Sequence, residues 1–71
     1  INLKSKNLSG IKFNDAILTN ADLTGANLSG ADLTNADLTG ANLSGADLTD
    51  AVLRDAQLTN INFENTKLFE V

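Results

Sequence analysis

A leucine or phenylalanine occupies every fifth position from Leu3 to Leu68, without insertion or deletion. An α-helix turns about 100° per residue, so five residues leave an offset of roughly 140° and produce no apolar stripe. A β-strand alternates its side chains, so the same spacing sends successive leucines to opposite faces. The chain must therefore turn once in every repeat to direct these side chains toward one axis, and so short a strict period indicates a solenoid.

Each of the five repeat positions has its own composition. The 71 residues form fourteen pentapeptides followed by Val71, with Leu twelve times and Phe twice at the third position and Ala nine times at the first. One large and one very small inward side chain predict a narrow core without a pocket. The fifth position is Gly, Asn or Asp except at Ser5 and Glu70, and these residue types tolerate the positive φ of a type II turn. Each repeat is thus predicted to be a short extended piece followed by a corner.

The sequence ADLTGANLSG, at residues 21–30 and 36–45, fits the pattern Ala-(Asp/Asn)-Leu-x-x at every defined position. On these residues the chain resembles the pentapeptide repeat family, and the likeness extends over all fourteen repeats. It implies an all-β fold, a right-handed quadrilateral parallel β-helix (solenoid) with four pentapeptides per coil. Residues 1–71 would then be a single domain of about 3.5 coils, roughly 17 Å tall at ~4.8 Å between stacked strands.

Five residues depart from this pattern at the inward first position: Ile1, Ile11 and Ile61 replace Ala by a larger apolar residue, and Lys6 and Thr66 replace it by a polar one. A lysine cannot be buried there without a partner, so the first coil is expected to be open or covered by another chain. The chain also begins at Ile1 rather than Met, and we expect it to be a fragment of a longer protein.

The residue types needed for catalysis are missing or scattered. The sequence contains no His and no Cys, so its many Ser and Thr hydroxyls lack the usual general base. With the four-sided coil that the family implies, Asp22, Asp32, Asp37 and Asp47 fall on four different faces, which argues against a carboxylate dyad and against the converging oxygens of a metal site. We expect a protein that is not an enzyme, with no catalytic residue, no cofactor and no metal.

Acidic residues dominate the middle of the chain, whose net charge is −4. Between residues 15 and 50 there are six carboxylates and no basic residue, and they form the candidate acidic surface: Asp15, Asp22, Asp32, Asp37, Asp47 and Asp50. Some proteins of the family mimic DNA and inhibit type II topoisomerases, which makes that activity the alternative hypothesis. Duplex DNA carries one charge per ~1.7 Å, so a rod of this height would need about ten charges to imitate it.

An internal copy bears on how the surface could be used. Residues 21–34 recur at 36–49, an offset of three repeats that rotates the pattern by a quarter turn on a four-sided coil. A face-specific recognition site would be scrambled by this rotation, whereas a rod with interchangeable faces would be unaffected. The copy therefore favours a non-enzymatic structural or protein-interaction module, a rigid spacer or docking rod of a larger protein.

The ends of the solenoid are the remaining candidate contact surfaces, with Lys4 and Lys6 at one end and Phe69 and Val71 at the other. We expect an unidentified protein or flanking domain to stack on the coil ends, or end-to-end self-association, and no nucleic-acid partner. The longest apolar run is far short of the ~20 residues that cross a bilayer, so this segment should not insert into a membrane. Its family is abundant in cyanobacteria and includes membrane-attached proteins; the compartment stays open between cytoplasm and lumen or periplasm.

Overall fold

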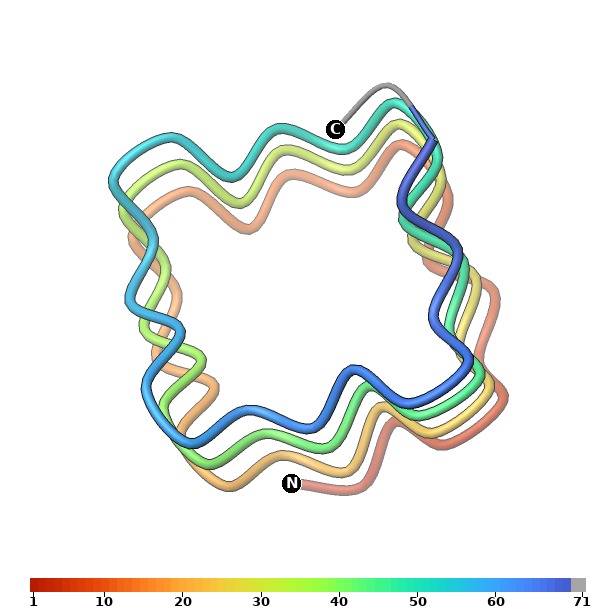
Figure 1. The fold of residues 1–71 in the computed structure, drawn as a ribbon. Helices are drawn as coiled ribbons and strands as arrows, with labels where there is room; N and C mark the ends of the chain where they lie inside the picture. Colours follow the sequence, from red (N-terminus) through yellow and green to blue (C-terminus); the bar gives the residue numbers. More distant parts are fainter. Residues whose placement is uncertain (70–71) are drawn as a thin grey trace.

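The chain winds into a coil with four sides, and the first coil and the last described residues lie at opposite ends of the coil axis (Figure 1). The structure is a computed structural model that describes residues 1–69. Its Cα extents are 20 × 20 × 17 Å, so the solenoid is about as wide as it is tall. The predicted height of roughly 17 Å agrees with the shortest of these extents.

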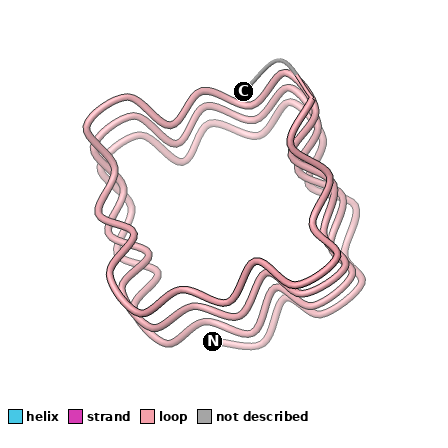
Figure 2. Cartoon of the chain, in the orientation of Figure 1, coloured by secondary structure: helices cyan, strands magenta, loops and turns pink. Residues whose placement is uncertain are grey.

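Successive coils are joined by parallel bridges between second-position residues exactly one coil apart, as Asn2 is bridged to Asp22. Each bridge in residues 1–69 is only one residue pair long, so Figure 2 draws the described chain as loops and turns although its coils are joined by a parallel ladder. The bridges define four columns, which we number as sides. Side 1 contains Asn2, Asp22, Asn42 and Asn62; side 2 contains Asn7, Asn27, Asp47 and Lys67; side 3 contains Lys12, Asp32 and Val52; side 4 contains Ile17, Asp37 and Gln57.

Three backbone hydrogen bonds repeat wherever one coil stacks on the next. On side 1 the Asp22 N–H donates to the Ile1 carbonyl (2.9 Å), the Leu3 N–H donates to the Asp22 carbonyl (2.8 Å), and the Ser5 N–H donates to the Thr24 carbonyl (2.9 Å). The same donors and acceptors recur on the other sides. Because the chain satisfies its polar backbone groups in this way at each turn of the coil, the ladder does not depend on long strands.

The corners lie at the fourth and fifth positions, as predicted. Every fifth-position residue from Ser5 to Asn65 has a positive φ, between 57° and 73°. The turn is closed by the next repeat, as where the Ala21 N–H donates to the Leu18 carbonyl (3.1 Å). Ser5 departs from the preferred residue types but adopts the same conformation, with a φ of 58°; Glu70 lies outside the described residues.

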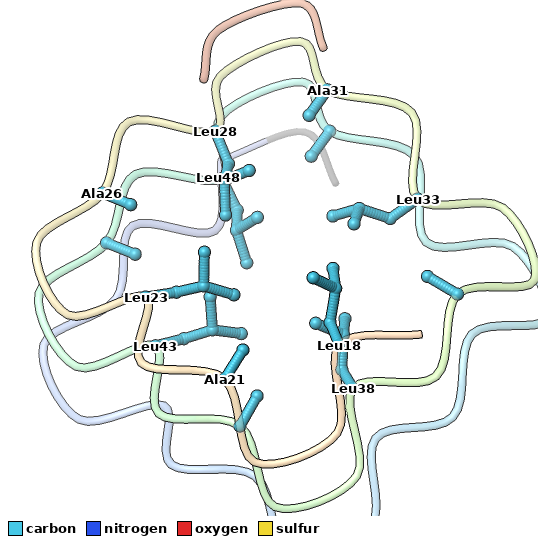
Figure 3. Packing of buried hydrophobic residues seen from close by; sticks show 14 residues of the cluster. Leu18, Ala21, Leu23, Ala26, Leu28, Ala31, Leu33, Leu38, Leu43 and Leu48 are labelled. Atoms are coloured by element: carbon cyan, nitrogen blue, oxygen red, sulfur yellow. The ribbon is translucent and has the colours of Figure 1, made fainter. Parts of the chain in front are cut away.

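The core consists of alternating large and small side chains that point inward from all four sides (Figure 3). The buried residues run from Leu18 to Ala51, and Leu23 and Leu48 are among those with no exposed surface. Toward the ends the inward residues are only partly buried, including Leu3 and Phe13 in the first coil and Leu58 and Phe63 in the last. Packing is therefore complete in the middle of the solenoid and open at both ends.

The two polar residues at the inward first position are accommodated in different ways. Lys6 is exposed, because no coil lies beyond it within the described chain. Thr66 turns its hydroxyl to the Leu43 carbonyl, 2.6 Å away in the preceding coil. This hydrogen bond compensates for a polar group at a position that is otherwise apolar.

Candidate functional site

The outward second-position side chains form the regular polar surface of the solenoid. An Asp or Asn there accepts a hydrogen bond from the backbone N–H two residues later, as Asp22 does from Thr24 (3.1 Å) and Asn27 from Ser29 (3.0 Å). At several repeats the hydroxyl of the fourth residue donates to the same oxygen, for instance Thr34 to Asp32 at 2.6 Å. Each pair holds the start of a corner in place, which is a local structural role.

These hydrogen bonds also affect the carboxylates. In Asp22, Asp37 and Asp47 the hydroxyl of the threonine two residues on, and then its backbone N–H, lower the pKa below that of an ordinary carboxyl. A carboxylate with a lowered pKa is a weak proton acceptor, and the Thr49 hydroxyl already donates to Asp47. The contacts between hydroxyls and carboxylates therefore favour corner formation over proton transfer.

Asp32 is the aspartate with the most hydrogen-bond donors. It accepts hydrogen bonds from the Thr34 hydroxyl, from the Asn14 side-chain amide (3.0 Å) and from the Thr34 backbone N–H (3.1 Å), and these lower its pKa, helped by the charge of Lys12. The contact with Asn14 joins a fourth-position residue to a second-position residue of the next coil, 18 residues later. This contact was not predicted from the sequence. It could have been found once the coil length of 20 residues is known, because residues 18 apart then lie diagonally across adjacent coils.

Basic residues from the end coils lie near the aspartates of the middle. The charges of Lys4 and Lys67 contribute to lowering the pKa of Asp22 and Asp47 respectively. The predicted acidic surface is thus bordered by lysines at both ends. Asp15 and Asp50 occupy fifth positions at corners, and both are exposed.

The acidic residues do not gather on one side. The charged residues, grouped by the side of their repeat, are Lys4, Asp22 and Glu64 on side 1; Lys6, Asp47, Asp50 and Lys67 on side 2; Lys12, Asp15, Asp32, Arg54 and Asp55 on side 3; and Asp37 on side 4. Sides 1, 3 and 4 each carry a net side-chain charge of −1, and side 2 is neutral over residues 1–69. The sides are therefore almost equivalent in charge.

The structure offers no enclosed site in residues 1–69. No cavity is present there, and no cluster of acidic side chains could hold a metal ion. No helix long and apolar enough to cross a membrane occurs in the same part of the chain.

The ends differ from the sides because their backbone ladder is open. The N–H groups of Leu53, Leu58 and Phe63 make no hydrogen bond with any described residue, and in the first coil the carbonyls of Asn2 and Lys12 likewise accept none. Lys4 and Lys6 are exposed at the first coil, and Phe69 is 67% exposed at the last. Val71, the remaining predicted end residue, lies outside the described residues.

Comparison with known proteins identifies relatives of the same repeat type. The family of pentapeptide repeats matches residues 2–40 and 31–68, with eight copies. The pentapeptide repeat protein Rfr23 of the cyanobacterium Cyanothece 51142 is 43% identical, with a TM-score of 0.90 over 93% of this chain and 46% of its own. A pentapeptide repeat protein from the thylakoid lumen of Arabidopsis thaliana is 41% identical, with a TM-score of 0.86 over 92% of this chain and 46% of its own.

A more distant similarity links the chain to QnrB1, a plasmid-mediated fluoroquinolone resistance protein, with 26% identity and a TM-score of 0.59 over 94% of this chain and 37% of QnrB1. No curated protein sequence matches. The chain thus spans less than half the length of these solved relatives, and their fold confirms the predicted right-handed quadrilateral β-helix. On the family match and these structures, the chain belongs to the pentapeptide repeat family.

Proposed function

We propose that this chain is a non-enzymatic spacer and protein-interaction module that makes its contacts through the two ends of its coil. The observation that carries the proposal is the contrast between sides and ends. The sides have satisfied backbone groups and almost equal charges, whereas the end coils have open backbone groups and partly buried core residues. Exposed ends of a solenoid favour a capping partner, because both the ladder and the core stop there.

A stacked coil or domain is the partner that fits such an end. It would supply carbonyls to the N–H groups of Leu53, Leu58 and Phe63 and cover their side chains. The similarity to the cyanobacterial protein and to the thylakoid lumen protein supports a place for this module in a larger cyanobacterial or lumenal protein.

Amide hydrogen exchange on an extended chain tests this proposal. One further coil with the sequence of residues 21–40 is joined after residue 70, where it continues the five-residue register. We expect the Leu53, Leu58 and Phe63 amides to become protected and the thermal midpoint to rise, by several degrees for each kcal/mol gained in a domain of this size. The control carries one additional glycine at the junction, which shifts the register.

The control separates stacking from mere extension of the chain, because its added coil cannot continue the ladder in register. Equal protection of the three amides with both additions would contradict the proposal. So would an in-register coil that folds without protecting them.

The alternative function is inhibition of a type II topoisomerase by imitation of DNA, which the similarity to QnrB1 supports. The even distribution of charge over the four sides counts against it. A supercoiling assay with DNA gyrase distinguishes the two functions: we expect no inhibition by the folded chain. Inhibition that disappears when Asp22, Asp32, Asp37 and Asp47 are replaced by Asn would favour the alternative.

A further inference from the structure

We draw no further inference here: the strongest candidate, the surface column on side 4 in which Thr19, Thr39 and Thr59 follow one another on successive coils, carries none because nothing in the structure shows what covers it.

Discussion

The corner holds the fifth residue of each repeat, from Ser5 to Asn65, in the unfavourable left-handed backbone conformation. Eight non-glycine residues adopt positive φ at this position, besides five glycines. A left-handed conformation costs an ordinary L-residue about 1–2 kcal/mol, and Asn and Asp tolerate it best. The hydrogen bonds of the ladder hold even Ser5 in this conformation.

Two corner glycines differ in the space around them. A Cβ at Gly40 would collide with the Asn20 side-chain oxygen, whereas one at Gly10 would have nothing within 4 Å. We expect Gly40→Ala to lower the free energy of unfolding slightly more than Gly10→Ala, because the exposed Asn20 side chain must rotate away; the cost of Gly10→Ala should be the 1–2 kcal/mol or so of the left-handed conformation. Urea denaturation measures both.

A double-mutant cycle with Asn20→Ala tests the cause. Removal of the Asn20 side chain should bring the cost of Gly40→Ala close to that of Gly10→Ala. An unchanged excess cost in the Asn20→Ala background would show that the collision is not its origin.

Acid should destabilise the fold through its second-position aspartates. The folded-state pKa values of Asp22, Asp32, Asp37 and Asp47 are lowered, so their contribution to stability is present above the unfolded-state pKa of about 3.9. It is lost as the pH falls through the folded-state values, because protonation weakens the acceptor. We therefore expect the thermal midpoint to fall below about pH 4.

The variant with Asn at all four positions is the matched test. Asn27 and Asn42 accept the same backbone hydrogen bond, so the variant should fold and lose most of this acid sensitivity. Thermal denaturation between pH 7 and pH 2 shows the difference. An equal fall of the midpoint in both proteins would place the acid sensitivity elsewhere.

At the scale of the element, the pentapeptide is a unit that works equally on any side. Asp22 and its copy Asp37 lie on sides 1 and 4, yet each accepts from the backbone N–H two residues on, at 3.1 and 3.0 Å. Asn27 and its copy Asn42 accept the same hydrogen bond from the backbone N–H two residues on, at 3.0 and 2.9 Å. The backbone hydrogen bond at this corner therefore follows position within the repeat and not the side of the coil.

Insertion of a third copy of residues 36–50 after Asp50 follows from this equivalence. The insertion rotates the last repeats relative to the first but keeps every leucine inward, so we expect a folded chain with a higher thermal midpoint, since solenoid stability grows with each stacked repeat. A 14-residue insertion that omits the final Asp breaks the five-residue register and should lower the midpoint. A similar midpoint for the two insertions would contradict the modular interpretation.

At the scale of the whole molecule, stability is concentrated in the middle coils. Leu33 has no exposed surface, whereas Leu3 is only partly buried at the open end. Leu33→Ala should cost about 2–5 kcal/mol, the range for a fully buried leucine, and Leu3→Ala distinctly less. Chemical denaturation measures this difference, and equal costs would mean that the first coil is as tightly packed as the middle.

Much of the architecture could be predicted because the repeat is strict. The five-residue spacing of residues such as Leu23 and Leu28 requires a turn in every repeat, and Gly, Asn and Asp mark the corners. The number of repeats per coil came from the family likeness, since five-residue periodicity alone does not determine how many corners close a turn. The placement of Asp22, Asp32, Asp37 and Asp47 on four sides followed from that number.

The inward direction of the side chains, the place of each corner and the lack of room for a pocket could all be read from the sequence, because these properties depend only on position within a repeat. The contacts between coils became visible only in the folded molecule: the diagonal from Asn14 to Asp32, the hydrogen bond from the Thr66 hydroxyl to the Leu43 carbonyl and the ladder groups left open at the ends. Such contacts join residues about 20 positions apart. They depend on how one coil is placed over another, which a five-residue pattern does not specify.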